Sequence, residues 1–167
     1  MLMTRRVEFR PYVPEGFEGE PVDEADALRR SRAVLAVEGR WLRGKWYQNL
    51  HPEVDPEDPF CNDWRVCAEG AVLMVTIGAA RLPGRNQPWT PRLPDTTTLR
   101  RREEQHKLYR SSVSLLTRAG QARWPGLGYV EANRFNDDNE RACRTRTDVL
   151  GWFDDAVALA EQEIAQR

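Results

Sequence analysis

The sequence lacks the residues and motifs from which most recognisable active sites are built. It has two histidines, His51 and His106, and three cysteines. It contains no nucleophile elbow, phosphate-binding loop, dinucleotide fingerprint or zinc-protease motif. These absences argue against the common nucleotide-dependent enzymes and against serine and zinc hydrolases. An enzyme that uses Asp and Glu alone stays open, but no particular reaction is indicated.

Long apolar runs and an excess of charge are also missing. The longest apolar run, Ala71 to Ala80, is far shorter than the ~20 residues that a membrane-spanning helix needs. Residues 1–10 have no apolar core of the kind found in signal peptides. The odd number of cysteines then predicts reduced thiols and a cytoplasmic location. The net charge of -1 argues against nucleic acid and acidic membranes as partners.

What is present is the composition of a globular protein. The 167 residues are 40% hydrophobic and 31% charged, which is enough for one domain with a core of its own. All but two of the 25 cationic residues, Lys45 and Lys107, are arginine. We interpret this bias as the codon usage of a GC-rich genome. The division expected is an N-terminal arm over 1–22 and a single helical domain over 23–167.

The hydrophobic periodicity predicts a mainly α fold, with about four helices, a short strand or hairpin, and long proline-rich loops. Helices are expected to begin near Asp23, Val66, Leu99 and Thr147, and Asp23 and Thr147 are the expected N-caps. The helix that begins near Leu99 is expected to end at Ala119, with Gly120 as its terminator. The segment 66–77 is apolar on all sides and should form the centre of the core. Its β-branched end also suits a buried strand.

Four short motifs are spread over more than a hundred residues. Trp41 and Gly44 follow the first helix, Cys67-x-x-Gly70-Ala71 opens the second, Asn136-Asp137 lies in a polar segment, and Arg146-Thr147 precedes the last helix. Together they resemble a small domain family of unknown function from actinobacteria and their phages. That family has C-x-x-G-A, W-N-D and R-T-x-x-V motifs, and here Phe135 replaces its loop tryptophan.

The resemblance implies a compact helical fold, a GC-rich bacterial or phage source, and a shared polar loop at Asn136-Asp137. It carries no established activity. Because the matching positions are so far apart in sequence, we expect Asn136-Asp137 to lie near Trp41 and the start of the Cys67 helix.

Two sets of residues could bind metal, but neither has a known spacing. Cys61, Cys67, Cys143 and His51 could supply four zinc ligands, yet the Cys61–Cys67 spacing is looser than in structural zinc sites. The segment 136–140 is rich in oxygen ligands but lacks the glycine of a calcium-binding loop. A polar turn is the simpler interpretation. We therefore expect no metal and no cofactor.

Glu69 is the most unusual charged residue, because it lies inside the most apolar run. An unpaired buried carboxylate is costly, so Glu69 should either reach solvent or pair with an arginine such as Arg134 or Arg146. A perturbed carboxylate can mark a functional site, but a structural ion pair is the more common explanation.

The leading functional hypothesis is a non-enzymatic protein, phage-encoded or from an accessory region, that binds a protein or a small ligand. The first alternative is a small hydrolase or transferase that uses Glu69 and Asp137 as acid and base. The second is a homo-oligomeric virion or assembly component. The contact regions would be the aromatic segment 41–47, the loop 81–98 and the Asn136 turn. The candidate binding residues are Trp41, Trp46, Tyr47, Glu69, Asn136, Asp137 and Arg146.

Overall fold

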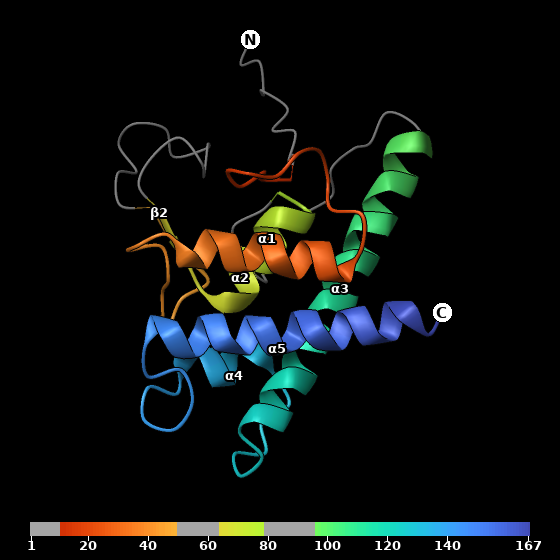
Figure 1. Ribbon diagram of the computed structural model, residues 1–167. Helices are drawn as coiled ribbons and strands as arrows, with labels where there is room; N and C mark the ends of the chain where they lie inside the picture. The colour runs from red at the N-terminus through yellow and green to blue at the C-terminus, as the bar shows by residue number, and fades with distance from the viewer. Residues whose placement is uncertain (1–10, 50–63, 79–95) are drawn as a thin grey trace.

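The computed structural model describes residues 11–49, 64–78 and 96–167 (Figure 1). Within these ranges the chain forms five helices and one two-stranded antiparallel hairpin, which confirms the predicted mainly α fold. None of the described helices is both long and apolar enough to cross a bilayer. The elements are α1 (Glu24–Ala36), β1 (Tyr47–Asn49), β2 (Trp64–Val66), α2 (Ala68–Thr76), α3 (Thr96–Arg123), α4 (Ala132–Asp137) and α5 (Arg146–Ala165).

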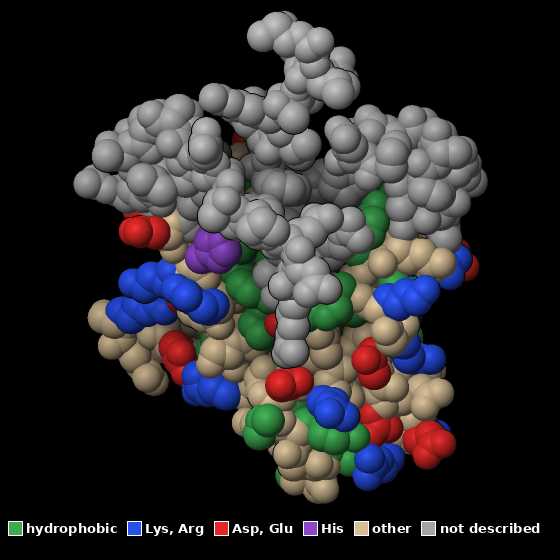
Figure 2. Space-filling view, turned by 180° about the vertical axis from the view of Figure 1, so that it is seen from behind, with side chains coloured by type: hydrophobic (Ala, Val, Ile, Leu, Met, Phe, Trp, Pro, Cys, Tyr) green, Lys and Arg blue, Asp and Glu red, His purple; other side chains and the backbone are tan. Residues whose placement is uncertain are grey.

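Helices α1 and α5 run side by side in opposite directions across one face of the molecule, and α3 crosses behind them (Figure 1). The antiparallel arrangement brings Arg29 of α1 to Glu161 of α5 and Arg32 to Asp154. On the opposite face, hydrophobic side chains gather near the middle, and charged side chains of both signs lie around them (Figure 2). The charged residues thus cover the outside of a helical core.

Helix α2 is the centre of that core, as predicted. Val72, Leu73 and Val75 are completely buried, and α1 and α3 both pack against this helix. The helix continues through Thr76, so the alternative of a strand in this segment is wrong. Buried apolar area on all sides is what stabilises such a short helix, since propensity alone does not.

Helix α2 begins later than the expected Val66. The backbone of Val66 is already paired with a neighbouring segment: its N–H donates to the Arg40 carbonyl (2.8 Å), and its carbonyl accepts from Leu42 N–H (2.9 Å). Val66 therefore ends strand β2, and Cys67 becomes the N-cap of α2. The Cys67 Sγ accepts a hydrogen bond from Gly70 N–H (3.2 Å).

Gly70 is required by close backbone packing. A Cβ at this position would lie 2.6 Å from the carbonyl oxygen of Trp46, which is much closer than a carbon and an oxygen can approach without displacement. The Cys67-x-x-Gly70 motif thus combines a helix cap with a glycine that lets the hairpin approach α2.

Helix α3 is longer than predicted. It runs from Thr96 to Arg123, so Gly120, which we expected to terminate it, lies inside the helix. A Cβ at position 120 would lie 2.8 Å from the ring of Phe135. Gly120 is therefore explained by the packing of α4 against α3 and not by a helix end.

The N-cap of α5 is Thr145, which corrects the expected Thr147. The Thr145 hydroxyl accepts from Asp148 N–H (3.4 Å), and the Asp148 carboxylate accepts from Thr145 N–H (2.9 Å). This reciprocal pair is a capping box. In a capping box the acidic residue follows the N-cap by three positions. Asp148 is three residues after Thr145 but only one residue after Thr147, so Thr145 is the N-cap. The N-cap of α1 is Asp23, as predicted.

Candidate functional site

Asn136 joins three segments that are far apart in sequence. Its side chain is completely buried. The amide oxygen accepts from Trp41 Nε1 (2.9 Å) and from Ala68 N–H (3.0 Å). The amide nitrogen donates to the Leu42 carbonyl (3.0 Å) and to the Asp137 carboxylate (2.9 Å). A carboxamide has two donors and two acceptor positions, so its hydrogen-bonding capacity is filled inside the protein.

Asp137 extends this arrangement to the surface. Its Oδ1 also accepts from Gly44 N–H (2.8 Å), and Gly44 has the positive φ of 76° that favours glycine. The prediction that Asn136-Asp137 lies near Trp41 and the start of α2 is confirmed. We call Trp41, Leu42, Gly44, Ala68, Asn136 and Asp137 the clasp.

The clasp depends on α4, a helix that the sequence did not predict. Phe135 of α4 is completely buried and packs against Trp124, Tyr129 and Trp152, with ring centroids 5.3–5.7 Å apart. These aromatic contacts fix the short helix, so the following Asn136 side chain points inward. The apolar Phe135 among polar neighbours was the one sequence signal for a buried face here.

The buried cysteines act as structural residues. Cys67 caps α2 and lies 3.4 Å from the Asn133 amide oxygen. Burial raises the pKa of Cys67 and of Cys143 to about 12, so both thiols stay protonated at neutral pH and are poor nucleophiles or ligands. The other two candidate zinc ligands, His51 and Cys61, lie outside the described residues. Within the described ranges, no three His, Cys, Asp or Glu residues are grouped to hold a metal ion.

Glu69 has a tyrosine partner in place of the expected arginine. The Tyr109 hydroxyl donates to Glu69 Oε1 (2.8 Å), and in the part of the chain that is described neither Arg134 nor Arg146 pairs with this carboxylate. Burial raises the pKa of Glu69, the hydrogen bond from Tyr109 opposes the shift, and the nearby Glu131 adds to it. The phenol pKa of Tyr109 is raised as well, mainly by burial.

The remaining predicted site residues lie around the clasp without joining it. Trp46 and Tyr47 are half-buried against the core, and the Trp46 carbonyl accepts from Cys67 N–H (3.1 Å). Arg146 is the first residue of α5; no hydrogen bond or ion pair connects it to the clasp among the described residues. The predicted loop 81–98 lies almost wholly outside those residues.

Arginines stacked on tryptophans flank the clasp, and we did not single them out from the sequence. The Arg43 guanidinium lies 4.5 Å from the centre of the Trp41 ring and donates to the Arg144 carbonyl (2.7 Å). Arg40 lies 4.1 Å from the centre of the Trp64 ring and donates to the Trp64 carbonyl (2.9 Å). Arginine beside tryptophan in the 40–43 run was the available signal, because this pair gives favourable cation–π contacts.

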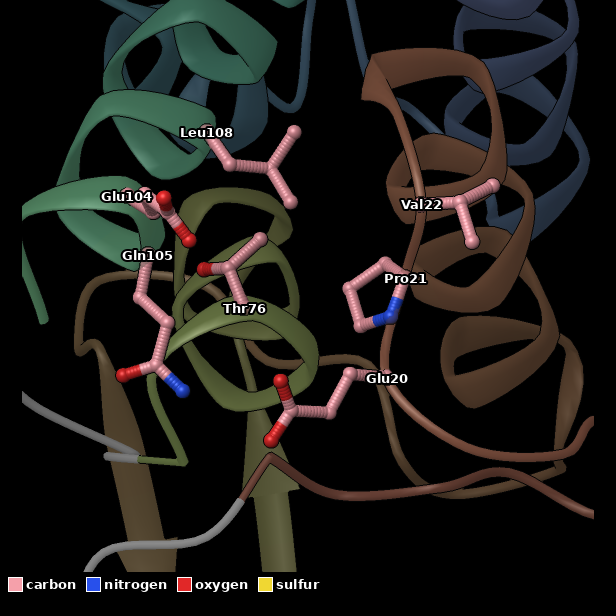
Figure 3. Close-up of a pocket in the computed structure, with 7 residues that line it drawn as sticks. All are labelled: Glu20, Pro21, Val22, Thr76, Glu104, Gln105 and Leu108. Carbon is pink, nitrogen blue, oxygen red and sulfur yellow. The ribbon is translucent and has the colours of Figure 1, made fainter. Parts of the chain in front are cut away.

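A hollow of about 300 Å³ lies elsewhere, between the segment preceding α1, the end of α2 and the first half of α3 (Figure 3). None of the predicted binding residues lines it. Its only hydroxyl, Thr76 Oγ1, donates to the Val72 carbonyl within α2 (2.7 Å). The lining residues are Glu20, Pro21, Val22, Thr76, Glu104, Gln105 and Leu108.

Comparison with known proteins gives a family but no characterised relative. No curated protein and no solved structure matches the chain. One family model, described as a family of unknown function (DUF6197), matches residues 19–159. The matched region includes all six residues of the clasp and most of the chain. The protein therefore belongs to this family of unknown function.

Proposed function

We propose that this protein is a non-enzymatic binding protein that presents the turn 42–45 to a protein partner. One observation carries the proposal: this surface turn is held by hydrogen bonds from α4. The Leu42 carbonyl accepts from Asn136, and Gly44 N–H donates to Asp137. A turn that is ordered before binding loses less conformational entropy when a partner docks.

The side chains of the turn suit this role. Arg43 and Lys45 are exposed, and Trp41 is half-buried beneath the Arg43 guanidinium. Arginine and tryptophan are both enriched where protein partners bind strongly. The buried side of the turn is thus structural, and its outer side is available to a partner.

The same proposal includes the setting in which the protein acts. An actinobacterial or phage origin is supported by the arginine-rich composition and by the family motifs. A cytoplasmic location is supported by the two described cysteines, Cys67 and Cys143, which are buried free thiols of the kind kept reduced in cytoplasm.

A carboxylate-based hydrolase or transferase is the second candidate, and the raised pKa of Glu69 favours it. A carboxyl group that stays protonated closer to neutral pH can act as a general acid. Asp137, the other member of the pair considered from the sequence, instead accepts hydrogen bonds from Gly44 and Asn136. A hydrolytic activity lost in Glu69→Gln and retained in Asp137→Asn would support this candidate.

The scarcity of lysine provides a direct test of the binding proposal. Lys45 in the turn and Lys107 on α3 are the only lysines, and both are exposed. An amine-reactive cross-linker would be added to the chain in an extract of its source organism, and cross-linked peptides would be identified by mass spectrometry. We expect one partner protein to be cross-linked through Lys45, with Lys107 as the internal control.

Two further results define the outcome. Arg43→Ser should weaken the Lys45 cross-link and lower the thermal midpoint of unfolding only slightly, because the contacts of Arg43 with the Trp41 ring and the Arg144 carbonyl are made by an exposed side chain. Cross-linking through Lys107 alone, or equally through both lysines, would contradict the proposed surface.

A further inference from the structure

The arginines of this protein fall into two groups. Among the described residues, seven arginines form ion pairs with carboxylates, and most of these pairs lie along the helices. The arginines around the hairpin and the start of α5 have no carboxylate partner among the described residues. The paired set is Arg29, Arg30, Arg32, Arg118, Arg123, Arg141 and Arg167.

Four cations that have no carboxylate partner among the described residues lie on two neighbouring segments. Arg43 Nη2 donates to the Arg144 carbonyl (2.7 Å), so the turn 42–45 lies against the segment that leads into α5. Lys45 and Arg146 each follow two residues later on these segments, which lie at the same end of the molecule (Figure 1). We call Arg43, Lys45, Arg144 and Arg146 the basic cluster.

The carboxylates beside the basic cluster are already used by the backbone. Asp137 accepts from Gly44 N–H, and Asp148 accepts from the N–H groups of Arg144 and Thr145 (3.0 and 2.9 Å). Both carboxylates therefore stabilise the turn and the helix cap. Within the described ranges, the guanidinium groups of Arg144 and Arg146 therefore have no carboxylate partner.

Two of these cations also occupy an electrostatically unfavourable place. Arg144 precedes the N-cap Thr145 and Arg146 follows it, so both lie at the positive end of the α5 dipole, where cations destabilise a helix. The interaction with the helix dipole therefore does not explain positive charge at these positions. An external anion would be favoured by the cations and by the helix end together.

We infer that the basic cluster binds a carboxylate-rich segment of the partner protein. This inference rests on the proposed function and specifies the chemistry of the partner. Arginine forms bidentate contacts with carboxylates. A nucleic acid fits less well, because domains that bind a phosphate backbone usually carry a strongly positive charge, whereas this chain has a net charge of -1.

Charge reversal at the cluster tests the inference without weakening the fold. Arg144→Glu/Arg146→Glu places acids where the helix dipole favours them, so its thermal midpoint should equal or exceed that of the wild type. The matched control is Lys107→Glu/Arg110→Glu, the same charge change on exposed residues of α3. Binding of a fluorescein-labelled polyglutamate peptide would be measured by anisotropy, beside an oligothymidylate of equal length.

The wild type should bind polyglutamate more tightly than oligothymidylate, with an affinity that falls as salt is added. Arg144→Glu/Arg146→Glu should weaken this binding about tenfold or more, while the control changes it less than about threefold. No binding of polyglutamate, equal losses in both variants, or tighter binding of oligothymidylate would overturn the inference. If the Lys45 cross-link persists in Arg144→Glu/Arg146→Glu, the proposed function is supported, but the inference that the partner presents an acidic segment is contradicted.

Discussion

At the scale of single residues, the hydrogen bonds of the clasp converge on Asn136. Asn136→Ala would leave Trp41 Nε1, Ala68 N–H and the Leu42 carbonyl without their partner. The Ala68 bond is buried and the other two are partly buried. A buried polar group left unsatisfied costs about 1–3 kcal/mol, so we expect the free energy of unfolding to fall by about 2 kcal/mol or more. Chemical denaturation would measure this loss.

Asn139→Ala is the matched control, because Asn139 is exposed two residues beyond the clasp. Its free energy of unfolding should stay within about 0.5 kcal/mol of the wild type. Equal effects of the two substitutions would show that Asn136 does not hold the segments together.

Glu69 makes stability depend on pH in a defined direction. The pKa of Glu69 is raised in the folded state, chiefly by burial. Its contribution to stability is therefore fully present below the ordinary pKa of a glutamate, and it is lost as the pH rises through the raised pKa of the folded state. Glu69→Gln keeps an acceptor for Tyr109 without a charge. We expect this variant to be more stable than the wild type at pH 7, and the difference to shrink on acidification to pH 4.

Asp138 provides a control of opposite sign. The hydrogen bond from Tyr129 is the main cause that lowers the pKa of Asp138, so Asp138→Asn should be less stable than the wild type at pH 7 and approach it on acidification. Thermal melts across this pH range would measure both differences. A Glu69→Gln variant less stable than the wild type at pH 7 would contradict the unfavourable burial of the Glu69 charge.

At the scale of elements, the start of α5 allows the N-cap expected from the sequence, Thr147, to be compared with the observed N-cap, Thr145. Thr145→Ala removes the hydroxyl of the capping box and should lower the free energy of unfolding by about 1 kcal/mol. Thr147→Ala alters an exposed residue inside the first turn and should change it by less than about 0.5 kcal/mol. Urea denaturation of both variants checks the assignment, which would fail if Thr147→Ala were the more harmful change.

The elements that periodicity could predict are those whose apolar stripe is long. Helix α5 was predicted because its buried residues repeat over several turns, and the centre of α2 because it is apolar on all sides. Helix α4 was missed because six residues hold too few turns to show a period. The start of α2 was misplaced because the pairing of Val66 with the segment 40–42 is a long-range contact.

At the scale of the whole molecule, the sequence could place Asn136-Asp137 near Trp41 only through the family motifs. No local pattern says that residues about a hundred positions apart will meet. The partner of Glu69 could not be predicted either, because Tyr109 lies on the inner side of α3 and its distance from α2 is set by helix packing. The basic cluster could not be predicted from the sequence either, because its residues come from two segments that meet only in the folded protein.

The central claim is that the clasp fixes the turn 42–45. Amide hydrogen exchange at Gly44 tests this claim most directly. This amide donates to the Asp137 carboxylate, whereas the Leu42 amide donates to the Val66 carbonyl and serves as the internal control. In the wild type, Gly44 should exchange at least about tenfold more slowly than an unstructured amide, and Asp137→Ala should abolish that protection while Leu42 stays protected. Exchange of Gly44 at the unstructured rate in the wild type, or protection unchanged in Asp137→Ala, would contradict a turn held by the clasp.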